Sequence, residues 1–192
     1  MDKRGAIEKF SKYLKSYNIK VLKDLDLGTV RFTMEYLGFE NSPGKSIESC
    51  IWWYDEAAEV RVYFNETGAK FCKEHPQNYN ELYRLLNFIN ARIWVQGSDF
   101  SGGSLYKSSN LYNPRIYMTE DGCYDITMNF TLPYDFYEVA PLESEDFITA
   151  TLPDLLNWLS PTIFSVILGK WSAEEAISFL KNQGFYRIKR HK

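Results

Sequence analysis

The residues that could do chemistry are few in this chain of 192 residues. Only two histidines occur, and His191 lies next to the last residue, so a catalytic triad or a zinc site would have to use His75. The segment CKEH places Cys72 three residues before His75, and an imidazole beside a thiol can stabilise a nucleophilic thiolate. Because the sequence offers no third group to orient the pair, we interpret Cys72 as a small apolar core residue and His75 as a loop residue.

The acidic and glycine-rich segments do not match the motifs of known cofactor sites. Carboxylates cluster at 54–59 (YDEAAE), 119–121 (TED) and 143–146 (ESED), where turn preference and the helix dipole explain them. The calcium-loop pattern and the C-x-x-C spacing of zinc sites are both missing. The segments SGGS (101–104) and PGK (43–45) lack the remainder of a phosphate-binding loop. We therefore predict no catalytic residue, no metal site and no cofactor.

The segment ELYRLLNFINARIW (81–94) carries two side-chain amides on a helical pattern. Its apolar stripe consists of Leu82, Leu85, Leu86, Ile89 and Ile93. Asn87, Asn90 and Tyr83 flank this stripe and could line a small-molecule pocket between the helix and a sheet, in a binding protein or an enzyme of unfamiliar type. The other interpretation, which we favour, is that the amides bond to backbone groups of a sheet edge or of the following loop.

Aromatic residues lie on both faces of two adjacent predicted strands, 46–54 and 58–64. Ile51, Trp53, Val60, Val62 and Phe64 lie on one face. Trp52, Tyr54 and Tyr63 lie on the other, which a half-exposed sheet would normally fill with polar residues. Either a helix of the same chain or a partner, including a second copy, is expected to cover these rings. Trp52, Tyr54 and Tyr63 are therefore the candidate partner-binding residues, since aromatic anchors dominate interfaces.

The spacing of apolar residues predicts an α+β fold in a single domain, with antiparallel sheets packed against helices. The predicted order is a helix (5–17), a three-strand meander (29–39, 46–54, 58–64), a loop with at most a helical turn (68–80), a helix (81–94), a second sheet region (115–119, 123–132), a polar connection (133–146) and C-terminal helices (147–160, 161–168, 172–183). A hydrophobic share of 45% and an aromatic share of 17% suit a folded core.

Three local signals set the predicted helix boundaries near the C-terminus. Ser160 and Pro161 are typical of a cap followed by the first helical position, so the pattern predicts a new helix at Pro161. Ser172 and Glu175 form a capping-box pattern. Gly184 is typical of a helix end.

Charge and cysteine content indicate the kind of partner and compartment. The formal net charge is −3, which gives no general attraction to nucleic acid or to anionic membranes. The basic segment 186–192 is interpreted as a solvated tail. Three widely spaced cysteines favour a reducing compartment, and the N-terminus has no apolar signal region. The longest uncharged stretch, 155–169, is too short to span a membrane. We expect a cytoplasmic protein that binds neither nucleic acid nor membrane.

The order of elements, with ELYRLLNFIN after the meander, RIYMTEDGCYDITMNFTL as the next hairpin and VILGKWSAEEAI near the end, resembles the YbjN-like family. That family shares the fold of the type III secretion chaperones. The resemblance covers most of 5–182, whereas the linker 133–146 and the tail after 183 depart from it. It implies a non-enzymatic cytoplasmic module that tends to dimerise, and it offers no catalytic residues to carry over.

The function that we expect from the sequence is recognition of a protein segment, or of a second copy of the chain, through apolar surface on the sheet and the C-terminal helices.

Overall fold

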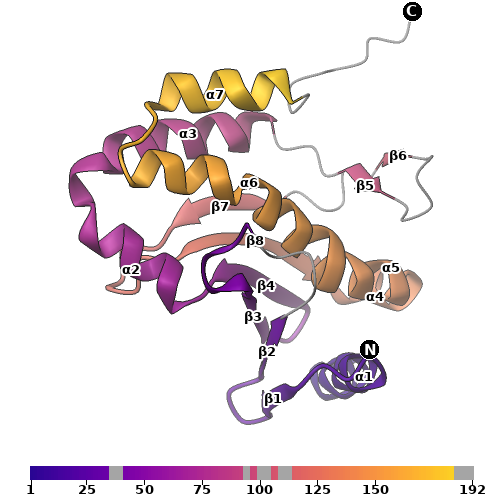
Figure 1. The fold of residues 1–192 in the computed structure, drawn as a ribbon. Coiled ribbons are helices and arrows are strands. Elements are labelled where there is room, and N and C mark those ends of the chain that lie inside the picture. Colours follow the sequence, from indigo (N-terminus) through magenta and orange to yellow (C-terminus); the bar gives the residue numbers. More distant parts are fainter. Residues whose placement is uncertain (35–40, 93–95, 99–104, 108–113, 184–192) are drawn as a thin grey trace, which may run out of the picture.

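The computed structural model describes residues 1–34, 41–92, 96–98, 105–107 and 114–183, and the side chains of 92–113 lie outside the description (Figure 1). The helices and strands are α1 (Lys3–Ser16), β1 (Val21–Asp24), β2 (Thr29–Met34), β3 (Ile47–Trp53), β4 (Ala57–Phe64), α2 (Glu66–Glu74), α3 (Tyr79–Arg92), β5 (Gln96–Ser98), β6 (Leu105–Lys107), β7 (Arg115–Met118), β8 (Ile126–Pro133), α4 (Tyr134–Val139), α5 (Pro141–Asp146), α6 (Leu152–Ile167) and α7 (Ala173–Asn182). This order confirms the α+β class that the sequence predicts.

The central element is one antiparallel sheet of six strands in the order β1-β2-β3-β4-β8-β7. The meander β2-β3-β4 is confirmed, but the prediction that the later strands form a second sheet region is wrong. Strand β8 pairs directly with β4, with Val60 opposite Phe130 and Val62 opposite Met128. The two strands pair because their alternating apolar residues meet on the same face, where one continuous core can cover them. Strands β5 and β6 form a separate pair.

The described helices pack against one face of the sheet, which we call the inner face (Figure 1). Phe10 of α1 contacts Phe32 of β2 and Trp53 of β3, with ring centroids 5.8 and 6.0 Å apart. At the other end, Phe64 of β4 packs edge-on against Phe164 of α6 at 5.0 Å. Helices α3 and α6 lie over the sheet, and α7 lies outside both of them. The opposite, outer face of the sheet carries no described helix.

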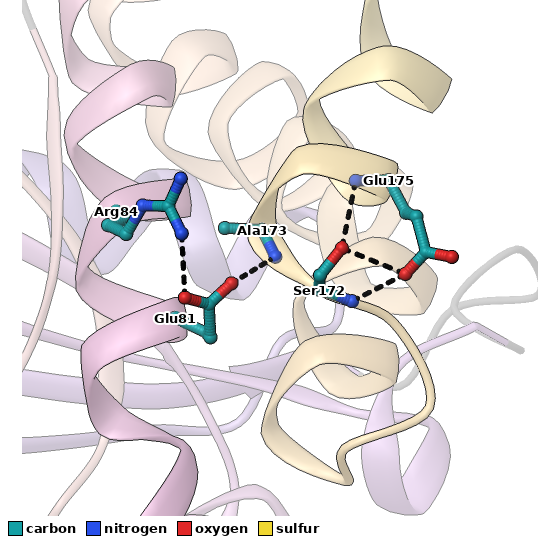
Figure 2. A network of polar contacts seen from close by, with 5 residues as sticks. All are labelled: Glu81, Arg84, Ser172, Ala173 and Glu175. Atoms are coloured by element: carbon teal, nitrogen blue, oxygen red, sulfur yellow. Dashed lines mark hydrogen bonds and ion pairs between the residues drawn. The ribbon is translucent and has the colours of Figure 1, made fainter.

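The N-terminus of α7 is held by two carboxylates that come from different helices (Figure 2). Ser172 and Glu175 form the capping box that the sequence predicts. Glu81 of α3 reaches across, and its Oε2 accepts a hydrogen bond from the backbone N–H of Ala173 at 2.7 Å, while its Oε1 binds Arg84 at 2.7 Å. Negative charge is favourable at this end because the first backbone N–H groups of a helix lack internal partners.

Strand β1 and helix α2 are two elements near the meander that the sequence pattern does not predict. The sequence predicts a loop with at most a helical turn at 68–80, but α2 occupies much of this segment. Asn65 caps α2 by accepting a hydrogen bond from the N–H of Thr67 at 3.0 Å. The helix stays close to the sheet because Gly68 has no side chain: a Cβ there would lie 2.6 Å from the Cβ of Phe64. The low helix propensity of glycine favours a loop at Gly68. Packing against the sheet therefore decides that this segment is helical.

The connection 133–146 is helical rather than irregular. It forms α4 and α5, and Tyr137 of α4 is fully buried while Glu145 of α5 is 3% exposed. The Tyr137 hydroxyl donates a hydrogen bond to Glu145 Oε1 at 2.6 Å. A buried polar pair of this kind satisfies both groups locally, so the polar sequence is compatible with a packed position.

The prediction of a helix boundary at Pro161 is wrong. Helix α6 runs continuously through Pro161, after a π-helical turn at Phe147–Thr151. Ser160 does not cap a helix, and its hydroxyl instead donates to the carbonyl oxygen of Asn41 at 2.6 Å. The helix continues because its buried residues before and after the proline, Leu156, Leu159, Ile163 and Val166, all contribute to one core, whereas Pro161 itself is exposed. The proline removes only one backbone hydrogen bond.

Candidate functional site

The outer face of the sheet places aromatic and charged side chains in regular rows. In the first row, Thr29 of β2, Trp52 of β3, Glu59 of β4 and Thr131 of β8 lie side by side. The second row contains Arg31, Cys50, Arg61, Asn129 and Arg115. The third contains Thr33, Glu48, Tyr63, Thr127 and Tyr117. The predicted distribution over two faces is confirmed, since Trp53 is buried on the inner face while Trp52 lies on the outer one.

The centre of this face is a stack of Arg61 on Trp52. The guanidinium carbon of Arg61 lies 4.6 Å from the centroid of the Trp52 ring, a cation–π contact. Glu59 holds the arginine in place, with Arg61 Nε 2.8 Å from Glu59 Oε1. Burial is the largest single influence on Arg61 and opposes its charge, but the hydrogen bond to Glu59 and the nearby charges of Glu59 and the tyrosines together outweigh burial and raise the pKa of the guanidinium. Trp52 is therefore partly covered by the side chain of Arg61. The helix of the same chain that was one of the two predicted covers does not occur among the described residues at this face.

The three candidate partner-binding residues differ in exposure. Tyr54 follows β3, is 54% exposed, and its hydroxyl donates to Glu59 Oε2 at 3.4 Å. Trp52 and Tyr63 are half-buried. Burial, followed by the charge of Glu48, raises the pKa of Tyr63 well above its ordinary range, so this hydroxyl stays protonated. Together they place aromatic rings beside charged groups on one face of the sheet.

The surroundings of Cys72 and Cys50 disfavour the thiolate that nucleophilic chemistry would need. Cys72 is fully buried, and burial raises the pKa of its thiol to about 12. His75 is hydrogen-bonded through Nδ1 to the carbonyl oxygen of Phe71 at 2.9 Å. The interpretation of Cys72 as a small core residue is therefore confirmed, and so is that of His75 as a residue of the connection before Pro76, where it follows α2 as its C-cap. On the outer face, burial raises the pKa of Cys50 to about 11, which disfavours a thiolate there as well.

Asn90 has the structural role that the sequence analysis favours. Its Nδ2 donates to the carbonyl oxygen of Ile116 at 2.8 Å, and its Oδ1 accepts from the N–H of Ile116 at 2.8 Å. Asn87 is exposed. The Tyr83 hydroxyl donates to Glu120. The structure thus brings Asn90 to the edge strand β7 and leaves Asn87 exposed on the same helix. Ligand binding by Asn87 and Tyr83 stays a prediction.

The space between α3 and the sheet is filled by side chains of the core. Leu82, Leu85, Leu86 and Ile89 of α3 are buried together with Ile116, Met118 and Met128. A shallow depression of about 400 Å³ lies elsewhere, on α1, where it is lined by Glu8, Lys9, Ser11, Lys12 and Lys15. Within the described ranges, no group of three or more His, Cys, Asp or Glu side chains is placed to hold a metal ion.

Comparison with known proteins gives no relative on which to base a function. No family model, curated protein or solved structure matches the chain. Among the described residues, no helix is both long enough and apolar enough to cross a membrane. The basic segment 186–192, with His191, lies outside the described residues, as does Ile93 of the predicted apolar stripe.

Proposed function

We propose that this protein is a non-enzymatic module that binds another polypeptide on the outer face of its sheet, with Trp52, Tyr54 and Tyr63 as anchors. One observation carries the proposal: the described helices pack on the inner face, while the outer face presents an aromatic cluster beside arginines. Aromatic rings and arginine are the residues that contribute most to protein interfaces.

The chemistry of the face supports a polypeptide over a reacting small molecule. At its centre Arg61 is already paired with Glu59, and the thiol of Cys50 is buried, with its pKa raised to about 11. A bound segment could place apolar side chains on the rings and polar groups on the surrounding arginines, without any bond being broken. The likeness of the sequence to the YbjN-like family agrees with such a module. Three free cysteines support a cytoplasmic location as part of the same proposal.

The proposal is tested by the binding of a permanently unfolded probe, reduced and carboxymethylated α-lactalbumin, measured by fluorescence anisotropy. Trp52→Ala is expected to weaken binding by about ten-fold or more, as loss of a central aromatic anchor does. Because Trp52 is half-buried and the core residue Trp53 on the opposite face is unchanged, the variant should keep its circular dichroism spectrum and its cooperative unfolding.

The matched control is Phe179→Ala, which removes an aromatic ring that is 40% exposed on α7, on the other side of the sheet. This variant should bind the probe as the wild type does. Equal binding by both variants, or no binding of the unfolded probe by the wild type, would remove the outer face as the recognition surface.

A further inference from the structure

The two edges of the six-stranded sheet differ in how they are protected. Edge strands present unpaired N–H and C=O groups to which another strand can bond. At β7, the side chain of Asn90 occupies both outward backbone groups of Ile116. At β1, by contrast, Leu22 is 71% exposed. Four of the large apolar side chains that are exposed in the described chain lie at this end of the molecule: Tyr17, Leu22, Leu25 and Leu27.

The register of the sheet shows which backbone groups of β1 point outward. Trp53 N–H donates to Gly28 O at 2.8 Å, so Gly28 and every second residue after it in β2 bond to β3. The alternate residues, Thr29 and Arg31, therefore bond to β1, where Asp24 and Leu22 stand opposite them. Consequently the N–H and C=O groups of Val21 and Lys23 point away from the sheet.

We propose that a second copy of the chain pairs with this edge, β1 against β1, antiparallel about a two-fold axis at Leu22. In this register, Val21 of one subunit exchanges backbone hydrogen bonds with Lys23 of the partner subunit. The two-fold axis repeats this exchange between Lys23 of the first subunit and Val21 of the partner subunit. Leu22 then faces Leu22 of the partner subunit as a non-hydrogen-bonded pair, the kind that brings side chains closest together. The result is a continuous sheet through two subunits.

Charge complementarity identifies the occupant as a second copy. Lys20 and Asp24 lie two residues before and two residues after Leu22, and they carry opposite charges. A two-fold axis at Leu22 therefore sets Lys20 opposite Asp24 of the partner subunit, and does so twice. Opposite charges directly across a strand pair are favourable and like charges are not. This symmetric arrangement suits a self-complementary interface.

The remaining exposed apolar residues are also placed for this pairing. Because the two β1 strands run in opposite directions, the hairpin tip of one subunit, with Leu25 and Leu27, lies toward the α1 end of the other, where Tyr17 is 62% exposed. Lysine at an edge commonly prevents pairing, but the Lys23 ammonium is held by Glu8 of α1 at 2.7 Å. The Lys23 ammonium therefore lies toward α1, and the backbone groups at the edge of β1 stay accessible.

This pairing is independent of the proposed recognition surface, because β1 lies at the edge of the sheet and Trp52 at its centre. The test is sedimentation equilibrium of the full chain at concentrations up to about 200 µM, well above the dissociation constant of about 1 µM at the weak end for interfaces of standard size. The wild type is expected to show twice the 22.5 kDa mass of one chain. Leu22→Lys, which sets two lysines opposite each other, should sediment as a single chain.

Val139→Lys is the matched control, since Val139 is 84% exposed on α4, away from this edge. It should leave the mass doubled. The register is tested separately by Leu22→Cys in a Cys123→Ser background, where oxidation should link two chains through residue 22, while Val139→Cys should not. A monomeric wild type overturns the proposal. The proposal is also overturned if the wild type has the doubled mass and Leu22→Lys keeps it. Circular dichroism of the Leu22→Lys monomer checks that the variant is folded, so that misfolding is excluded as the cause of dissociation.

Discussion

The side-chain amide of Asn90 replaces a neighbouring strand for Ile116. Both bonds, from Nδ2 to the Ile116 carbonyl and from the Ile116 N–H to Oδ1, are 2.8 Å long. An amide side chain has the same donor and acceptor as a peptide group, so α3 closes the edge of the sheet at this point. The relationship fixes α3 to β7 and prevents an outside strand from pairing there.

Asn90→Ala should lower the free energy of unfolding by about 1–3 kcal/mol, because it leaves a backbone donor and acceptor of β7 without partners. Urea denaturation measures this loss. Asn87→Ala is the control, since Asn87 is exposed on the same helix and should change stability by less than about 0.5 kcal/mol. Faster hydrogen exchange at the Ile116 amide should accompany Asn90→Ala. Equal effects of the two variants would contradict this role of Asn90.

Glu81→Gln should loosen α7 from α3, since it removes a negative charge from the N-terminus of α7 (Figure 2). The Ala173 N–H, followed by Arg84, lowers the pKa of the Glu81 carboxyl. A lowered folded-state pKa means that the stabilisation is present above the unfolded pKa and is lost as the pH falls through the folded one. The difference between wild type and Glu81→Gln should therefore shrink in acid.

Hydrogen exchange of the α7 amides measures this effect at neutral and at acid pH. Glu174→Gln provides the control, because Glu174 is exposed in the first turn of the same helix. Glu174→Gln removes a negative charge near the N-terminus of α7 but keeps the hydrogen bond between Glu81 and Ala173. If the α7 amides of both variants exchange at the same rate, Glu81 has no special part in holding α7.

Pro161→Ala should raise the free energy of unfolding by about 1–3 kcal/mol, because proline inside a helix removes a backbone hydrogen bond and strains the preceding turn. The position is exposed, so little packing is lost. Thermal unfolding measures the change. Pro141→Ala serves for comparison, since Pro141 starts α5 and the first helical position tolerates proline. A neutral Pro161→Ala would indicate two separate helices in place of α6.

Glu145→Gln should stabilise the protein at neutral pH. Burial raises the pKa of the Glu145 carboxyl, although its hydrogen bond from Tyr137 acts in the opposite direction. The folded state therefore binds the proton more tightly than the unfolded state, so wild-type stability falls as the pH rises from the unfolded pKa through the raised folded one. Glutamine keeps the acceptor for the Tyr137 hydroxyl and has no charge to bury.

Urea unfolding of wild type and Glu145→Gln across this pH range measures the difference. The advantage of the variant should be absent in acid and grow toward neutral pH. Glu143→Gln is the control on the same helix, since Glu143 is exposed. A constant difference at all pH values would show that the Glu145 charge carries no folding cost.

Local sequence determined the elements whose patterns agree with their packing. Strict alternation placed Trp52 and Trp53 on opposite faces of the sheet, and helical spacing located α1 and α3. The capping pattern of Ser172 and Glu175 fixed the start of α7. These features depend on neighbours within a few residues, where the periodicity of side-chain direction is enough to decide.

Tertiary structure decided the features that depend on distant partners. The pairing of β8 with β4, the path of α6 through Pro161 and the bonds of Asn90 to Ile116 each join residues that no local pattern connects. Arg61 over Trp52 is a cross-strand contact of the same kind. The physical reason is that burial and hydrogen bonding across the core outweigh local propensities of a few tenths to about 3 kcal/mol per residue, so only the assembled fold shows which of them prevails.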